Sequence, residues 1–279
     1  MKFVFFGTPR FAAAVLGRLI EKGSAPIALV TNPDMPVGRK KIITPPETKT
    51  LILKTKSGIP ILQPKKIDAE FLERLNKLEA DIFVVAAYGK MLPQKLLDIP
   101  RYGVINIHPS ILPKYRGASP VQSAILDGEN ETGVTLFKID EAMDHGPLYC
   151  DKKVEIKPED NTPSMFEKLA VAGADLLIDR LFPNIDILSP VPQTESAATY
   201  TRKFATSDGF IEYSDLKKAE TEGGSLANMI DRKIRAFYPE PGCWTMEGPV
   251  RIKLLDSVIE DGKLRLKIIQ KEGKKPVIL

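Results

Sequence analysis

Cysteine and histidine are both scarce in this chain of 279 residues, which contains two of each. Cys150 and Cys243 lie far apart and form no CxxC pair, so we expect neither a thiolate zinc site nor a disulfide framework, and a reducing compartment fits this usage. With two histidines, any metal shell would need carboxylates to complete it. We therefore expect no metal in this protein.

Long apolar runs are missing as well. No stretch approaches the roughly 20 apolar residues that cross a bilayer, and the apolar start Lys2–Phe6 ends at Gly7, too early for the core of a signal peptide. Neither sign of charge is in large excess, because 40 Lys and Arg face 36 Asp and Glu and leave a net charge of +4. That balance leans basic but does not by itself identify a nucleic-acid partner. We expect a cytoplasmic protein with no membrane partner.

Short β-rich runs alternate with helical patterns over about the first 180 residues. Alternation of this kind is typical of an α/β fold, in which helices cover both faces of a mostly parallel, Rossmann-like sheet. Strands are predicted at Lys2–Phe6, Pro26–Thr31, Ile59–Gln63, Asp81–Ala87, Val104–His108 and Val134–Ile139. Helices are predicted at Pro9–Lys22, Pro46–Lys56, Asp68–Leu78, Ala118–Leu126 and Ser164–Leu181.

The pattern breaks between Asn184 and Thr206, where prolines punctuate a segment without a sustained period, as in a linker. Beyond it the sequence predicts one amphipathic helix and a small β-rich domain. The helix is expected at Ser225–Phe237 and the strands at Cys243–Met246, Arg251–Val258 and Leu264–Ile269. We therefore expect a catalytic domain over residues 1–183, a linker over 184–206 and a second domain over 207–279.

Two polar side chains stand out on the predicted strand Val104–His108. Asn106 and His108 are two residues apart, so they point to the same side of the sheet. Pro109 ends the strand and places His108 at its carboxyl end, the edge at which open α/β sheets bind their ligands.

Asp144 lies in an acidic loop that follows another predicted strand, from where it could reach an imidazole and favour its protonated form. An amide, an imidazole and a carboxylate without a Ser or Cys nucleophile suit direct acyl transfer to an amine. The first two can donate to the oxyanion of a tetrahedral intermediate, each donor contributing about 3 kcal/mol, and the carboxylate can accept the proton of the amine. A structural Asn–His pair and a solvated acidic loop would explain the same spacing, so the spacing alone leaves both interpretations open.

Two adjacent segments, Asn106–Ser110 and Leu112–Gly117, resemble the signature of the folate-dependent formyltransferases. Further segments resemble the branch of that superfamily that formylates methionyl-tRNA, and the resemblance covers nearly the full chain. These segments are Gly7–Ala12, Asn32–Lys41, Ala87–Pro93, Gly117–Gln122, Glu131–Thr135 and Ile234–Gly242.

The resemblance implies a donor, an acceptor and a set of site residues. The donor would be 10-formyltetrahydrofolate, the acceptor initiator methionyl-tRNA in translation initiation, and the catalytic residues Asn106, His108 and Asp144. The folate would lie against Tyr88, Gly89, Lys90, Met91, Leu92, Ile139, Asp140 and Glu141. The tRNA would contact Arg39, Lys40, Lys41, Ser110, Pro113 and Arg116, with Arg265 and Lys267 on one face of a strand tracking its backbone.

The resemblance also implies that the second domain is an OB-like β-barrel, here with fewer strand-like runs than a full barrel, and we expect a monomer. Two alternatives remain open: a sugar-nucleotide N-formyltransferase with the same donor and catalytic residues, and a non-catalytic tRNA-binding protein. The basic loop at Arg39 and the segment Ile234–Gly242 favour the tRNA enzyme over the sugar enzyme. His145 stands where the family usually has a small residue, so it is either incidental or tunes Asp144.

Overall fold

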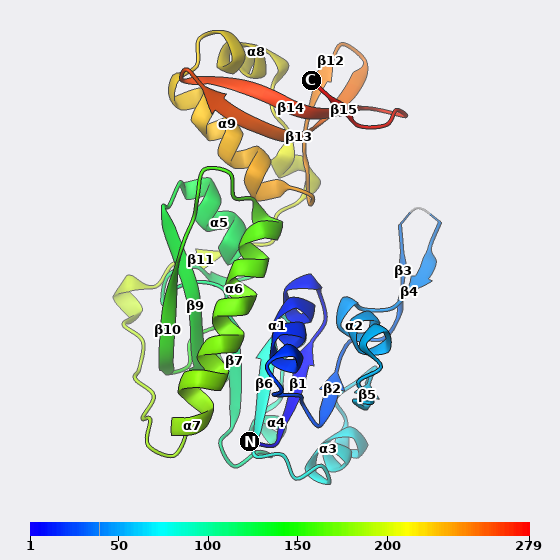
Figure 1. Cartoon of the computed structure of the whole chain (residues 1–279), viewed down its shortest axis with the longest axis vertical. Coiled ribbons are helices and arrows are strands. Elements are labelled where there is room, and N and C mark those ends of the chain that lie inside the picture. Colours follow the sequence, from blue (N-terminus) through cyan, green and yellow to red (C-terminus); the bar gives the residue numbers. More distant parts are fainter. Residues whose placement is uncertain (39) are drawn as a thin grey trace. The chain divides into compact units, whose positions relative to one another are not determined.

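The computed structural model describes residues 1–38 and 40–279, which form two compact units (Figure 1). The first unit comprises Met1–Arg116, Gly133–Val154 and Phe166–Thr199, and the second comprises Gly117–Thr132, Glu155–Met165 and Tyr200–Leu279. The second unit thus includes two segments from within the first 183 residues. The domain boundaries expected from the sequence stay a prediction, and Arg39 lies outside the described residues.

A seven-stranded sheet in the order β10-β9-β7-β6-β1-β2-β5 forms the centre of the first unit. The five strands from β5 to β7 are parallel, and β9 runs antiparallel to β7. This confirms the mostly parallel α/β sheet expected from the sequence. The strands are β1 (Phe3–Gly7), β2 (Ala28–Val30), β5 (Ile61–Leu62), β6 (Ile82–Ala86), β7 (Val104–His108), β9 (Glu131–Lys138) and β10 (Leu148–Glu155).

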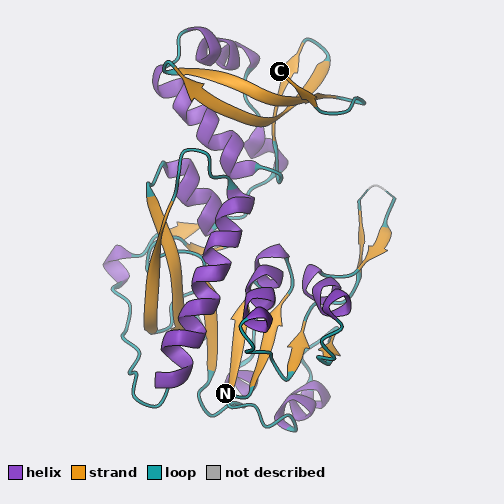
Figure 2. Ribbon diagram, in the orientation of Figure 1, coloured by secondary structure: helices purple, strands orange, loops and turns teal. Residues whose placement is uncertain are grey.

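Helices pack on both faces of this sheet because its central strands are apolar at every position (Figure 2). Val4 and Phe6 of β1 pack with α3 and α4, whereas the ring of Phe3, on the other face, lies 5.3 Å from that of Phe182 in α7. The helices that lie wholly or mostly in this unit are α1 (Arg10–Glu21), α2 (Glu47–Thr55), α3 (Ala69–Asn76), α4 (Gln94–Leu97), α6 (Thr162–Leu176), the π-helical turn η1 (Leu177–Leu181) and α7 (Phe182–Asn184).

Every strand and helix predicted in the first 183 residues is present, with ends shifted by a few residues. Helix α4 was not predicted, and the strands that were not predicted include β10 and a hairpin formed by β3 (Met35–Val37) and β4 (Ile42–Thr44). These strands are largely exposed or half-exposed, so they lack the apolar run by which buried strands are recognised.

The second unit contains an antiparallel sheet in the order β12-β13-β14-β15. The amphipathic helix α9 packs against β13 and β14, as its apolar stripe predicts. Among the described residues the sheet has β12 and β15 as its edges, and β12, β13 and β14 correspond to the three strands expected from the sequence. Its elements are α5 (Pro120–Asp127), η3 (Thr206–Gly209), α8 (Tyr213–Thr221), α9 (Gly224–Phe237), β12 (Cys243–Glu247), β13 (Val250–Glu260), β14 (Lys263–Lys271) and β15 (Val277–Ile278).

The segment expected as a linker has short structured pieces. The turn η2 (Glu195–Ala197) is followed by β11 (Tyr200–Thr201), which pairs with β8 (Arg116–Gly117). Within residues 1–38 and 40–279, each helix is too short or too polar to span a bilayer.

Candidate active site

Strand β7 positions two of the three predicted catalytic side chains. It lies between β6 and β9, with Asn106 opposite Val85 and His108 opposite Thr135. His108 is 4% exposed, and Asn106 is half-buried. Because side chains alternate along a strand, both project from the same face of the sheet, as the sequence predicts.

Both nitrogens of the His108 ring face oxygen atoms of the protein. Nε2 lies 3.0 Å from the carbonyl oxygen of Tyr115, and Nδ1 lies 3.7 Å from Oδ2 of Asp144. The contact to a carbonyl requires a hydrogen on Nε2. The distance of 3.7 Å between Nδ1 and Oδ2 is longer than a hydrogen bond.

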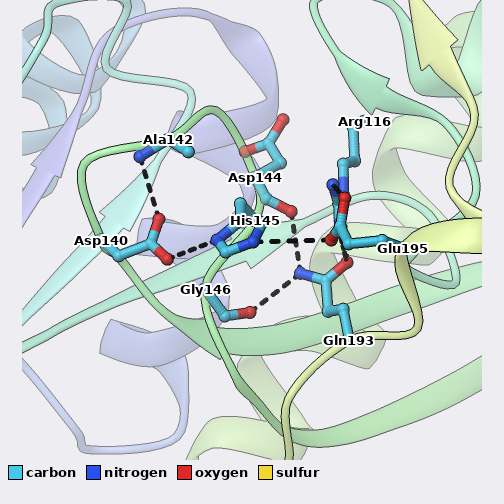
Figure 3. A network of polar contacts seen from close by, with 8 residues as sticks. All are labelled: Arg116, Asp140, Ala142, Asp144, His145, Gly146, Gln193 and Glu195. Carbon is cyan, nitrogen blue, oxygen red and sulfur yellow. Dashed lines mark hydrogen bonds and ion pairs between the residues drawn. The ribbon is translucent and has the colours of Figure 1, made fainter.

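Asp144 reaches His108 from a loop between β9 and β10. Its φ of 49° lies in the left-handed region, which residues other than glycine seldom occupy. The side-chain amide of Gln193 donates to the backbone carbonyl oxygens of Asp144 and Gly146, both at 2.8 Å (Figure 3). The loop is thereby fastened on both sides of His145.

The side chain of Asn106 has an unused polar atom. Its Oδ1 is buried and has no hydrogen-bond partner among the described residues. Buried polar atoms in proteins are nearly always paired, so each unpaired one calls for an explanation. A hydrogen-bond donor on a bound molecule would satisfy this oxygen.

A second set of charges surrounds the loop (Figure 3). Arg116 is 1% exposed and donates from Nη2 to Glu195 at 2.6 Å, which holds the pKa of that carboxyl below its ordinary value. His145 lies 2.6 Å from Asp140 through Nδ1 and 3.5 Å from Glu195 through Nε2. The ring of His145 therefore faces the carboxylates of Asp140 and Glu195.

Sequence reasoning missed the residues that support the catalytic side chains. Gln193 and Glu195 lie in the segment expected as a linker, and no sequence pattern marks them. Thr135 is fully buried, and its hydroxyl donates to the carbonyl of Ser110 and accepts from the amide of Leu112. It thereby fixes the turn that follows His108.

The residues expected to bind folate divide into buried and accessible groups. Tyr88 is 2% exposed, its ring meets that of Phe6 edge-on at 5.5 Å, and burial raises its pKa to about 12. Leu92 and Ile139 are partly buried against the same apolar cluster, whereas Gly89 is exposed with a φ of 76° and Met91 is 80% exposed.

The polar members of this set make contacts of their own. Lys90 donates from Nζ to the carbonyl of Pro64 at 2.8 Å, and Asp140 accepts from the amide of Ala142. Glu141 is exposed. Among the described residues, the backbone amides and carbonyls of residues 90–92 make no hydrogen bond. This stretch therefore offers backbone donors and acceptors to a ligand.

The residues expected to contact tRNA lie in different surroundings. Lys40 and Lys41 are exposed at the turn of the β3–β4 hairpin, and Arg265 and Lys267 are exposed on β14. Pro113 is half-buried, Ser110 is fully buried and bonds the carbonyl of Lys114, and Arg116 is paired with Glu195. Ser110 and Arg116 therefore bond inside the protein, and their roles toward tRNA stay predictions.

Within the part of the chain that is described, no cluster of side chains could hold a metal ion.

Comparison with known proteins identifies relatives of this chain. Residues 1–181 match the family model "Formyl transferase". The chain is 37% identical over 295 aligned residues to methionyl-tRNA formyltransferase of Thermodesulfovibrio yellowstonii, an alignment that covers 98% of this chain and 92% of that protein.

Two solved structures share the fold at low sequence identity. HypX from Aquifex aeolicus in complex with tetrahydrofolic acid is 14% identical with a TM-score of 0.67, and the match covers 100% of this chain but 46% of HypX. The N-formyltransferase from Helicobacter canadensis, in complex with folinic acid and dTDP-3-aminofucose, is 18% identical with a TM-score of 0.62, covering 94% of this chain and 88% of that one.

Proposed function

Because the chain belongs to the methionyl-tRNA formyltransferase family, we propose that Asn106, His108 and Asp144 carry out its formyl transfer. The enzyme moves the formyl group of 10-formyltetrahydrofolate to the amino group of methionyl-tRNA, the reaction that serves translation initiation. We place this reaction in the cytoplasm with the translation machinery.

One observation carries the assignment of the three residues. His108, at the carboxyl end of β7, faces Asp144 across 3.7 Å, and Asn106 projects from the same face of the strand, where its amide nitrogen can donate. The arrangement joins two potential donors and one carboxylate at the edge where α/β sheets bind ligands.

The donor supplies a formyl carbon bonded to nitrogen, and the reaction exchanges that bond for one to the methionine amine. Asn106 and the protonated ring of His108 donate hydrogen bonds to the formyl oxygen as it gains negative charge. Asp144 orients the ring and accepts the proton that the amine loses, directly or through water, and a proton passes to the folate nitrogen as its bond to the formyl carbon breaks. Since the amine attacks directly, the enzyme needs no covalent intermediate of its own.

The residues present fit a folate at this site. The unbonded backbone groups of residues 90–92 can pair with the edge of a flat heterocycle, and Leu92 and Ile139 supply apolar surface beside them. Tyr88 contributes by packing, because its buried ring belongs to the core. The solved structures of the same fold with tetrahydrofolic acid and folinic acid support this choice of ligand.

The proposed tRNA contacts are electrostatic. Lys40 and Lys41 on the exposed hairpin turn, with Arg39 between Gly38 and Lys40 in the sequence, can neutralise phosphates near the acceptor end. Arg265 and Lys267 offer a second pair of charges on β14. Contacts to phosphates fix the position of a nucleic acid and do not read its sequence.

A formyl-transfer assay with 10-formyltetrahydrofolate and two acceptors tests the proposal. We expect charged initiator tRNA to gain formyl, and a dTDP-aminosugar to gain none. Transfer to the sugar alone would identify a sugar-nucleotide enzyme, and transfer to neither acceptor would favour a tRNA-binding protein without activity. His108→Ala is the matched control, because a contaminating transferase would survive that substitution.

A further inference from the structure

Gln193 uses all the hydrogen-bonding capacity of its side-chain amide. Its nitrogen donates to the carbonyl oxygens of Asp144 and Gly146 at 2.8 Å each, and its oxygen accepts from Nε of Arg116 at 3.1 Å and from Nη2 at 2.8 Å. An amide has two donor hydrogens and two acceptor lone pairs, so none remains. If Oε1 and Nε2 of Gln193 exchanged places, the oxygen would face two carbonyl oxygens. The hydrogen bonds therefore fix the orientation of the amide.

The loop that Gln193 holds needs support. Asp144 has a φ of 49°, and a non-glycine residue keeps such a conformation only when its surroundings impose it. Gly146 packs so closely against β9 that a Cβ at this position would collide with the carbonyl of Lys138. The backbone of Gly146 is thus pressed on β9 on one side and bonded to Gln193 on the other.

The same contacts connect Gln193 to His108. Arg116 follows Tyr115 in the chain, and the carbonyl of Tyr115 accepts from Nε2 of His108. A closed ring of contacts therefore runs from His108 through Tyr115, Arg116 and Gln193 to Asp144, and back to His108 across 3.7 Å. The last of these contacts is the one that the reaction uses.

Arg116 is well suited to anchor this ring. Its guanidinium also donates from Nη1 to Glu195 at 3.0 Å, so two side chains of one segment share a single buried cation. The segment that contains Gln193 and Glu195 is thereby bonded to β8 as well as to the loop of Asp144.

We propose that Gln193 is a positioning residue, which holds Asp144 at the distance and angle from His108 that formyl transfer requires. This inference rests on the proposed function. Gln193 does not touch the reacting groups itself; it acts through the backbone of Asp144. A displacement of about 1 Å in a catalytic group can reduce the rate by about a hundredfold.

Single-turnover formyl transfer to methionyl-tRNA tests the inference with Gln193→Ala and Gln193→Glu in the full chain. We expect the rate constant of both variants to fall at least about tenfold, with the KM for the folate donor nearly unchanged. Glutamate can still accept from Arg116 but has no hydrogen for the two carbonyls, so it isolates the bonds to the Asp144 loop. Gln94→Ala, which removes an exposed glutamine that bonds Asp98, should behave as the wild type.

A double-mutant cycle separates positioning from a general structural role. In an Asp144→Asn background, Gln193→Ala should cause little further loss, because the group that it positions has already been disabled. Equal losses in both backgrounds would overturn the inference, and so would wild-type rates in both Gln193 variants. A wild-type chain without any formyl transfer would instead refute the proposed function.

Discussion

The unpaired oxygen of Asn106 predicts a substitution that raises stability while it lowers activity. In Asn106→Leu, an apolar side chain of similar shape replaces the amide. The buried Oδ1 has no partner among residues 1–38 and 40–279, and an unsatisfied buried polar group costs about 1–3 kcal/mol. Removing it should therefore stabilise the protein free of substrates by about 1 kcal/mol, which corresponds to about 2–4 °C in melting temperature.

The same substitution should lower the rate of formyl transfer although it raises the stability. A donor to a developing oxyanion contributes about 3 kcal/mol, and each 1.36 kcal/mol is about tenfold in rate. We therefore expect the turnover of Asn106→Leu to fall by about a hundredfold or more, while the affinity for the folate donor is largely kept.

Two measurements decide this prediction: thermal unfolding without ligands, and single-turnover formyl transfer to methionyl-tRNA. Thr245→Val is the matched control, since Thr245 also has a buried oxygen without a partner in the described chain but lies on β12, outside the proposed site. It should raise the melting temperature and leave the rate unchanged. A near-normal rate in Asn106→Leu would refute the role of Asn106 as a donor, and a lowered melting temperature would show that the amide stabilises the fold.

Three further substitutions or treatments have defined outcomes. Asp144→Asn should reduce turnover by about a hundredfold, because a neutral amide neither holds an imidazolium nor accepts a proton; retained activity across neutral pH would contradict this role. Arg39→Ala should weaken tRNA binding and lower the slope of log K against log salt by about one, whereas an unchanged slope would dismiss the phosphate contact. Burial raises the pKa of Cys150 to about 11 and that of Cys243 to about 12. Both thiols are therefore protonated at neutral pH and should resist alkylation by iodoacetamide there. The alkylation rate should rise only as the pH approaches these values. Rapid alkylation of either thiol at neutral pH would show that its surroundings are open.

Much of the fold could be predicted because its signals are local. The run Val4–Phe6 and its counterpart in β6 are apolar at every position, which is typical of central parallel strands. Helix α9 has a regular apolar stripe that meets β13 and β14. The hairpin of β3 and β4 escaped prediction because its residues are exposed and carry no periodic burial pattern.

Part of the candidate site could also be predicted from the sequence, and part could not. The positions of Asn106 and His108 on one face of β7 follow from the two-residue spacing of a strand. Asp144 was expected close to His108, and the structure gives a separation of 3.7 Å. For Arg116, the sequence suggested a contact with tRNA, but the structure shows a buried cation that binds Gln193 and Glu195. Its proposed contact with tRNA stays a prediction.

The sequence by itself determined which polar groups are present and, through the two-residue spacing of Asn106 and His108, that two of them project from one face of β7. Only the tertiary structure decided how these groups are held. Gln193 lies 49 residues from Asp144 along the chain, and no local pattern could pair them. Hydrogen bonds between such distant residues form only after the sheet and its loops have packed, since their partners are brought together by the fold and not by their spacing in the sequence.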